Sequence, residues 1–433
     1  MNYKQKVLYF ISFIFILQNS PQILAQDVIE NPLDTLTRTV TNSVDEITKM
    51  KRLKITGYIQ PQFQYIDSAG APSVAGGDFV NGTSKYYSRF MMRRGRFKFT
   101  YTFENVEMVI NTDATEKGLF MRETFVKVTD KKLEIFSLTA GLLQEQFGFE
   151  LNQSSGVRET PERARYNQLL FPVERDLGIF GSMVLPKWSK FYGLKVDVAM
   201  MNGVGGVNPE FDSHKDFTGR IQYNKTTINE KISFSIGASY YNGGYRAGVY
   251  KDYNYQVLNN GDKGFTFATD TANYNRIAKR EYIGADFQGA LDWKAGITTI
   301  RAEYITGQQP GTDKSNRSPL GAPTASLYHR TFNGAYFYFI QNIGLTKFQV
   351  VAKYDWYDPN IKISGKEIGK SGTNTKLADI RFDTFGFGCN YRIATNLKLM
   401  AYYDLVINEA TLINGYTKDI KDNVITIRMQ YKY

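Results

Sequence analysis

Basic and aromatic residues alternate in the segment SRFMMRRGRFKF, which spans residues 88–99. Arg94, Arg96 and Lys98 stand two positions apart, and the positions that follow them include two phenylalanines. Guanidinium groups donate paired hydrogen bonds to phosphate or carboxylate oxygens and keep their charge at physiological pH. The chemistry that these residues could perform is therefore the binding of anions, and its nature depends on the element that carries them.

Residues suited to catalysis or metal binding are scarce. The 433-residue chain has two histidines, His214 and His329, and one cysteine, Cys389. Neither histidine has a recognisable nucleophile beside it, and a single cysteine excludes an internal disulfide framework and a cysteine-based zinc site. We therefore expect no enzymatic activity, no metal and no cofactor.

The overall composition favours strands and turns. The chain has 30 Tyr, 30 Phe and 37 Gly but only 12 Pro, and its formal net charge is +11. Aromatic and glycine-rich sequence without long apolar runs is typical of a protein with many strands. The positive charge is compatible with a nucleic acid, an anionic membrane surface or an anionic solute as partner.

The first 25 residues are predicted to be a cleaved signal peptide. Lys4 and Lys6 precede the apolar run VLYFISFIFIL, and Ala25 offers a cleavage point. An apolar run of this length is too short to cross a hydrocarbon layer of ~30 Å. No later segment approaches ~20 apolar residues, so the mature chain either leaves the membrane or crosses it as strands.

Residues 26–52 are predicted to form a short helical segment. Asn31 suits an N-cap and Pro32 the first helical position, and apolar residues recur from Leu33 to Met50 at spacings of three and four. Two interpretations stay open for this helix. It could be a short coiled coil that supports oligomerisation, or it could fold back on the body of the protein or into a lumen.

From residue 53 the apolar period changes to two. The segments LKITGYIQPQFQYI and VITIRMQYKY both alternate apolar and polar residues. Between them, fourteen further strand candidates start near residues 87, 105, 119, 133, 177, 192, 217, 231, 278, 293, 329, 345, 381 and 396. This gives about 16 strands over residues 53–433, joined by short turns and by long polar connections such as 243–277 and 307–328.

These strands fit a transmembrane antiparallel β-barrel better than a soluble sandwich. Ten or more residues per strand match a tilted membrane crossing, and aromatic strand ends match interfacial girdles. We therefore expect an all-β outer-membrane barrel in contact with lipids and no nucleic-acid partner. Tyr433 ends the last strand and is predicted to be recognised by the barrel-insertion machinery.

Strand parity predicts which basic residues face the lumen. If the apolar series faces lipid, the other series faces water inside the barrel, because Arg or Lys at the bilayer midplane costs ~2–4 kcal/mol. The predicted anion-guiding residues are Arg94, Arg96, Lys98, Lys195, Arg220, Arg301, Lys353, Arg392, Lys398 and Arg428. With Lys54, Lys347 and Lys432 they make thirteen bases against four acids, Asp197, Glu303, Asp355 and Asp404. Such a wall would concentrate anions and reject cations.

The alternation in residues 88–99 has one irregularity. Arg93 shares the parity of the phenylalanines, and not that of Arg94. A bulge or a strand start near Gly95 would reconcile the two series. It would leave Arg89 and Arg93 at the rim of the barrel.

A long connection, residues 150–176, is the candidate constriction of the lumen. Arg158, Arg163, Arg165 and Arg175 lie there beside Glu159, Glu162 and Glu174. Thr160 and Pro161 have the character of a helix start. The alternative is an external loop whose solvated salt bridges contribute little.

Several segments together resemble the phosphate-selective porin O and P family in its Bacteroidetes-type form. They are RRGRFKFTYTF, FMRETFVKV, AGLLQEQFGFE, ERDLGIFGS, QVVAKYDWYD and the closing pair FGCNYRIATNLKLMAYYD and ITIRMQYKY. The resemblance runs from about residue 50 to the end. It implies a 16-stranded outer-membrane barrel, commonly a homotrimer, whose lumenal bases guide phosphate and related anions by passive diffusion. The alternatives are a general or sugar-selective channel and, more distantly, an adhesin or scaffold barrel.

Overall fold

The computed structural model describes residues 40–41, 46, 49, 51–72, 79–227, 230–246, 248, 251–269, 273–274 and 276–433. The chain divides into two units, Met1–Arg52 and Leu53–Tyr433. The predicted signal peptide lies outside the described residues, as does nearly all of the predicted helical segment 26–52. Both stay predictions, and the second unit is described below. Among the described residues, no helix is both long and apolar enough to span a lipid bilayer.

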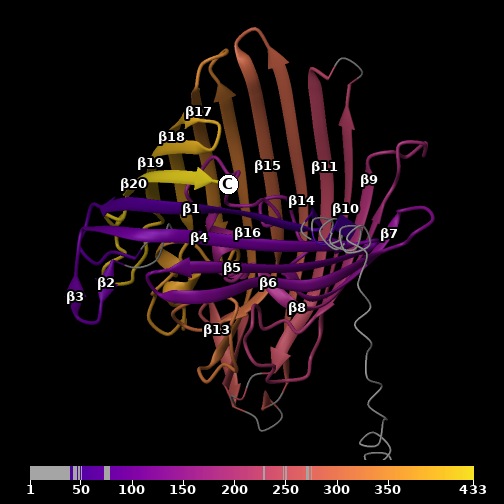
Figure 1. Ribbon diagram of the computed structural model, residues 1–433. Helices are drawn as coiled ribbons and strands as arrows, with labels where there is room; N and C mark the ends of the chain where they lie inside the picture. The colour runs from indigo at the N-terminus through magenta and orange to yellow at the C-terminus, as the bar shows by residue number, and fades with distance from the viewer. Residues whose placement is uncertain are drawn as a thin grey trace, which may run out of the picture. The chain divides into compact units, whose positions relative to one another are not determined.

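Sixteen strands of the second unit form a closed antiparallel barrel (Figure 1). They are β1 (Leu53–Ile66), β4 (Ser88–Phe103), β5 (Val106–Thr115), β6 (Gly118–Thr129), β7 (Phe136–Gln144), β8 (Arg175–Val184), β9 (Leu194–Met201), β10 (Asp216–Thr226), β11 (Ile232–Arg246), β14 (Ile277–Trp293), β15 (Gly296–Gly311), β16 (Leu327–Asn342), β17 (Phe348–Asp358), β18 (Phe382–Ala394), β19 (Leu397–Asn408) and β20 (Val424–Lys432). Each pairs with its neighbours in this order, and β1 pairs with both β4 and β20, which closes the ring. In Figure 1 the indigo strand β1 lies directly beside the yellow strand β20.

The predicted strand order is confirmed. Each of the sixteen predicted starts lies within three residues of an observed barrel strand. Strand β20 shows the physical cause, because Ile425, Ile427 and Met429 are exposed on the outer face whereas Thr426 and Arg428 are buried inside. Lipid outside and a polar interior impose a period of two on every strand, which makes the pattern readable in the sequence.

The connections differ in length between the two ends of the barrel. Turns such as 104–105, 294–295 and 395–396 lie at the end where β1 begins and β20 finishes, which we call the short-turn side. The opposite end, the long-loop side, carries 67–87, 145–174, 202–215, 247–276, 312–326, 359–381 and 409–423. The turn 116–117 between β5 and β6 is the short exception on that side.

Short regular elements lie within the long connections. They are the hairpin β2 (Val80–Asn81) with β3 (Ser84–Lys85), the helix α3 (Arg165–Leu170), the hairpin β12 (Lys251–Val257) with β13 (Lys263–Thr269), and the 3-10 turns η2 (Gly365–Glu367) and η3 (Leu377–Asp379). The sequence predicted only a polar loop over 243–277. Instead β11 extends to Arg246, and β12 pairs in parallel with the start of β16, where the Tyr253 and Tyr328 rings stack at 4.2 Å. Aromatic packing between distant loops thus creates a hairpin that local sequence did not reveal.

Three register shifts interrupt the regular pairing of the wall, in β4, in β6 and near the end of β18. Gln60 of β1 pairs with Arg94 and Pro61 with Met92, so Arg93 is an extra residue in β4. Proline has no backbone N–H to donate to a ladder, which favours an irregular pairing opposite it. The bulge predicted near Gly95 is therefore confirmed, and it lies at Arg93. A second register shift makes Arg122 the extra residue in β6.

Candidate functional site

The connection between β7 and β8, residues 145–174, lies inside the barrel. The backbone N–H groups of Phe149 and Glu150 donate to Glu303 of β15, at 2.8 and 3.1 Å. Near the middle of the connection, the hydroxyls of Ser155 and Tyr58 of β1 lie 2.5 Å apart. Contacts to such distant strands require the loop to reach across the lumen.

Aromatic packing fixes the loop to one wall of the barrel. Phe171 of the loop packs against Tyr241 of β11 and Tyr282 of β14, with ring centroids 6.1 and 5.9 Å apart. Phe147 packs against Phe171 at 5.4 Å. All four side chains are at most 2% exposed, so this part of the barrel is filled with protein.

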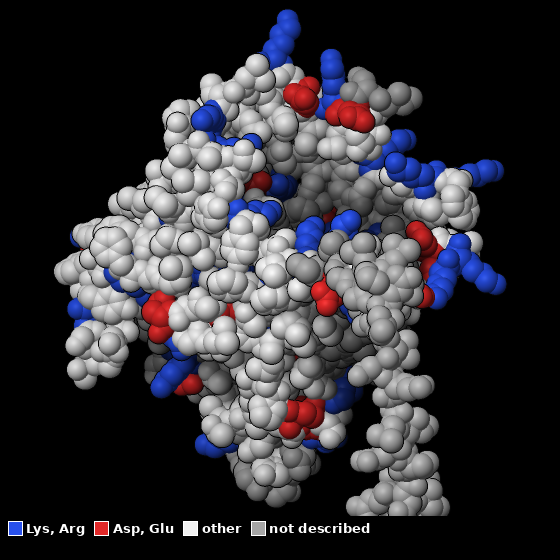
Figure 2. All heavy atoms as spheres, in the orientation of Figure 1, with Lys and Arg blue, Asp and Glu red and all other residues white. Residues whose placement is uncertain are grey.

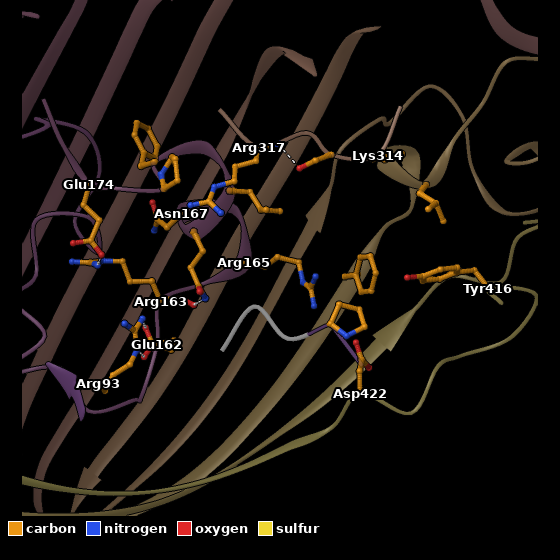
Figure 3. A pocket seen from close by; sticks show the side chains of 18 residues that line it. Arg93, Glu162, Arg163, Arg165, Asn167, Glu174, Lys314, Arg317, Tyr416 and Asp422 are labelled. Carbon is orange, nitrogen blue, oxygen red and sulfur yellow. Dashed lines mark hydrogen bonds and ion pairs between the residues drawn. The ribbon is translucent and has the colours of Figure 1, made fainter. Parts of the chain in front are cut away.

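On the other side of the loop, three arginines lie within 3.0 Å of the carboxylate of Glu162, and Figure 3 shows one of them, Arg93. Arg93 and Arg94 of β4 lie 2.7 and 3.0 Å from it, and Arg428 of β20 lies 2.9 Å away. Burial alone would raise the pKa of Glu162, but the three guanidinium charges more than offset it and hold the pKa well below its ordinary value. Glu162 therefore stays ionised and anchors the loop to the seam between β4, β1 and β20.

A second loop carboxylate, Glu174, is also surrounded by three arginines. Arg122 of β6 lies 3.2 Å from it and Arg175 of β8 lies 2.5 Å away, while Arg163 forms a third ion pair. Arg175 reaches Glu123 as well, at 3.0 Å. Arg158 also lies 4.0 Å from Glu162, so around Glu162 and Glu174 together arginines outnumber carboxylates by seven to three. The region keeps an excess of positive charge.

The predicted lumenal bases are mostly ion-paired, and five of them meet carboxylates that parity counting did not include. Seven of the ten are ion-paired: Arg94 and Arg428 with Glu162, Arg96 with Asp113, Lys195 with Asp197, Arg220 with Asp286, Arg301 with Glu159, and Lys353 with Asp355. The four-acid count left out Asp113 and Asp286 on the wall and all carboxylates of the inward loop. The wall is therefore less positive than the sequence predicted, because the acids that face it come partly from distant segments.

The other three bases lie toward the short-turn side. Lys98, Arg392 and Lys398 form no ion pair with a carboxylate in the described part of the chain, and the Lys398 ammonium donates to the Arg158 carbonyl at 3.0 Å. Arg392 and Lys398 line a cavity of about 340 Å³ together with Lys347. Figure 2 shows this end hollowed between the short turns, with Lys and Arg side chains at its rim.

The four arginines predicted in the loop have different roles. Arg158 and Arg163 are buried and donate to backbone carbonyls, such as those of Pro161 and Leu151, so they hold the loop together. Arg175 belongs to β8 and forms the ion pairs described above. Arg165 faces the long-loop side and is considered further below.

The helix start predicted at Thr160 is wrong. Helix α3 begins at Arg165, with Ala164 before it. The Thr160 hydroxyl instead donates to the carbonyl of Glu162, at 3.0 Å, so it is not available as a cap. Glu150, from the other limb of the loop, accepts the Ala164 N–H.

Two functional arginines were misplaced or missed by sequence reasoning. Arg93 was expected at the rim and Arg122 was not predicted, yet both point inward to loop carboxylates. A bulge places two adjacent side chains on one face, which breaks simple parity. The sequence carried a partial signal in the pair of arginines before Gly95.

Tyr433 lies at the seam that closes the barrel. Its backbone exchanges two hydrogen bonds with Gly57, both of 3.1 Å, and its ring lies 6.1 Å from that of Phe97. The side chain is 43% exposed. Recognition of Tyr433 by the barrel-insertion machinery stays a prediction.

The fold is that of outer-membrane porins. The outer-membrane channel DcaP of Acinetobacter baumannii matches with a TM-score of 0.52 and 12% identity, over 88% of this chain and 97% of that one. The anion-selective porin of Comamonas acidovorans matches with a TM-score of 0.50 and 9% identity, over 88% and 99%. OmpF of Salmonella typhi in complex with daunomycin matches with a TM-score of 0.50 and 11% identity, over 88% and 97%.

Neither a family model nor a curated protein sequence matches the chain. The resemblance to the phosphate-selective porins therefore stays a prediction. Structural similarity at 9–12% sequence identity shows only that the fold is shared.

Proposed function

We propose that the protein is an outer-membrane porin through which small anions, phosphate among them, diffuse passively. The observation that carries this proposal is the excess of arginines over carboxylates around Glu162 and Glu174, where the inward loop meets the barrel wall. Positive charge within low-dielectric walls raises the local concentration of anions.

The proposed mechanism uses weak, successive contacts. Lys98, Arg392 and Lys398 lie toward the short-turn side without a carboxylate partner among the described residues, so they can offer their charge to a passing anion. Ion pairs such as Arg94 with Glu162 reduce the net attraction at the loop. This suits conduction, since an anion that is held tightly would not leave.

The reversal potential of single channels in a KCl gradient tests the proposal. We expect chloride to be more permeant than potassium in the purified full-length protein. The triple variant K98Q/R392Q/K398Q should lower this preference, because it removes charge without leaving a described carboxylate unpaired. K187Q/K190Q, in an exposed turn of the short-turn side, is the matched control.

Cation selectivity, or no conductance, would contradict the proposal. Competition by phosphate tests the narrower claim. A chloride current that millimolar phosphate does not reduce would indicate a general anion pore.

A general or sugar-selective channel is the second candidate. The observation that favours it is the pairing of seven of the ten predicted lumenal bases with carboxylates, which weakens the positive field. This candidate expects similar chloride and potassium permeabilities. It also expects uptake of neutral sugars in a liposome-swelling assay.

We further propose export by the signal peptide, an outer-membrane location and assembly as a homotrimer. The apolar outer faces of strands such as β20 suit contact with lipid. OmpT of Vibrio cholerae, with a TM-score of 0.50 and 10% identity over 88% of this chain and 99% of that one, is a trimer in one solved form. Native mass spectrometry in detergent would distinguish a trimer from a monomer.

A further inference from the structure

A cavity of about 600 Å³ lies on the long-loop side of the inward loop. Helix α3 contributes Arg165 to it, and the connections 312–326 and 409–423 contribute Lys314, Arg317, Tyr416 and Asp422 (Figure 3). Polar residues of the inward loop and Arg93 of β4 complete the lining. This volume lies within the ~300–1,000 Å³ of typical small-molecule sites. Glu162 and Glu174, with Arg93 and Arg163, line one part of this cavity as ion pairs, whereas three other cations of its lining form no ion pair with a described carboxylate.

Three cations of the cavity have free donor groups. Arg165, Lys314 and Arg317 make no side-chain ion pair or hydrogen bond with any described residue, and the latter two are exposed. The Nε of Arg165 is buried without a hydrogen-bond partner. Figure 3 shows the Arg165 side chain pointing away from Arg163 and Glu174, toward the region of Asp422. A buried, unpartnered guanidinium donor in a cavity is costly unless a ligand satisfies it.

Aromatic side chains stand beside these cations. The Arg165 guanidinium lies 4.0 Å from the centroid of the Phe382 ring, and Tyr416 lines the same cavity. Leu377 adds an aliphatic surface. The cavity thus combines charged donors with an apolar wall, whereas a small inorganic anion would use only the donors.

We propose that this cavity is a binding site for an organic anion that carries a ring next to its phosphate or carboxylate group. Arg165, Lys314 and Arg317 bind the anionic group, and Phe382 and Tyr416 pack against the ring. The proposal rests on the proposed function, since it names the class of solute that the porin takes up at its long-loop side. It is distinct from phosphate selectivity, because the ring supplies part of the binding energy.

Phenyl phosphate and inorganic phosphate are the probes, since they share a head group and differ by the ring. Isothermal titration calorimetry on the full-length protein in detergent should give at least fivefold tighter binding of phenyl phosphate. F382L should reduce this ratio to below twofold and leave phosphate binding unchanged. K314A/R317A should weaken both ligands at least fivefold, whereas the matched control K187A/K190A should change neither.

Equal affinity for the two ligands, absence of binding, or an unchanged ratio in F382L would overturn the inference. Because K314A/R317A alters exposed residues, it retains the fold and tests the charged part of the site independently of F382L. The calorimetry does not depend on conductance. A cation-selective channel that binds phenyl phosphate would therefore contradict the proposed function alone, and an anion-selective channel that does not bind it would contradict this inference alone.

Discussion

At the scale of single residues, the lumen is organised around carboxylates that each meet more than one guanidinium. Glu162 contacts Arg93, Arg94 and Arg428 while only 6% of its side chain is exposed. Charges this deeply buried are stable only when paired and hydrogen-bonded. Glu162 therefore serves two purposes, since it fixes the loop to the wall and lowers the positive charge of the lumen.

The variant E162Q separates these effects, because it removes the charge but keeps the shape. We expect the chloride-to-potassium permeability ratio to rise roughly threefold, since one unit charge at several ångströms in water contributes about 0.7 kcal/mol. The free energy of unfolding should fall by about 3 kcal/mol, because a buried ionic cluster loses one partner. Reversal potentials and urea unfolding in detergent measure the two effects.

The control for this variant is E134Q, an exposed glutamate in the turn between β6 and β7. It should change neither quantity. An unchanged or lower permeability ratio in a folded E162Q protein would show that the Glu162 cluster does not face the conducting path.

Asp422 gives the binding cavity a pH dependence. The pKa of Asp422 is raised to about 7, chiefly by burial, with the carboxylates of Asp419 and Asp67 acting in the same direction and the Arg165 charge opposing them. Below this pKa the carboxyl is neutral, and above it a negative charge stands beside Arg165 and Tyr416. We therefore expect the Asp422 charge to weaken the binding of phenyl phosphate roughly threefold at pH 8 relative to pH 6, on the same Coulomb estimate.

The variant D422N tests this expectation by calorimetry at the two pH values. It should bind phenyl phosphate roughly threefold more tightly than the unmodified protein at pH 8, and with nearly the same affinity at pH 6. Because phenyl phosphate itself gains charge over this range, the comparison is between the two proteins at each pH. The same pH profile in both proteins would contradict the role of Asp422.

At the scale of elements, bulges and the inward loop determine the interior. Regular strands β4 and β6 would point Arg93 and Arg122 toward lipid, and the extra residue in each strand turns them inward. The loop 145–174 meets these arginines on one side and the aromatic wall of β11 and β14 on the other. The loop thus connects the arginine side of the lumen with its aromatic side.

The variant F171A tests the aromatic anchor of the loop. Phe171 is 2% exposed and packs against Phe147, Tyr241 and Tyr282. Its truncation should destabilise the protein by about 3–5 kcal/mol and release the loop, so that single-channel conductance and current noise increase. F191A, in the exposed turn between β8 and β9, is the control. Conductance equal to that of the unmodified protein would mean that the loop does not limit the current.

At the scale of the whole molecule, the barrel is closed by pairing of its first and last strands. Strand β20 pairs with β1 over most of its length, and Tyr433 continues this pairing through Gly57. A closed barrel leaves no unpaired strand edge in the bilayer, which is a requirement for spanning it. The apolar outer face and the polar interior are consequences of the same closure.

The variant Y433A distinguishes closure from recognition by the insertion machinery. Its backbone can still pair with Gly57, so folding of the purified protein into detergent should be nearly unchanged. Assembly in cells should fall several-fold if the terminal aromatic is recognised. Heat-modifiable migration in outer-membrane fractions measures assembly, and Y192A, in an exposed turn, is the control. If folding of the purified variant fell by the same factor as its assembly in cells, the effect would be due to barrel closure alone.

The sequence by itself determined the barrel. A period of two from Leu53 to the end of β20 predicted sixteen strands and their order, because lipid and lumen act on every strand locally and identically. The same rule predicted that Arg94, Arg96 and Arg428 face inward, and they are buried there. Composition alone also made an anionic partner plausible.

Only the tertiary structure decided how that charge is balanced. Glu162 neutralises Arg428 from a position 266 residues away in the chain, and Arg220 of β10 meets Asp286 of β14 across the intervening strand β11. Such pairs depend on register, on bulges and on the path of a loop through the lumen. These features arise from long-range packing, which leaves no periodic trace in the sequence. The positive wall that the sequence predicted is therefore, in the folded protein, a set of ion pairs with a local excess of arginine.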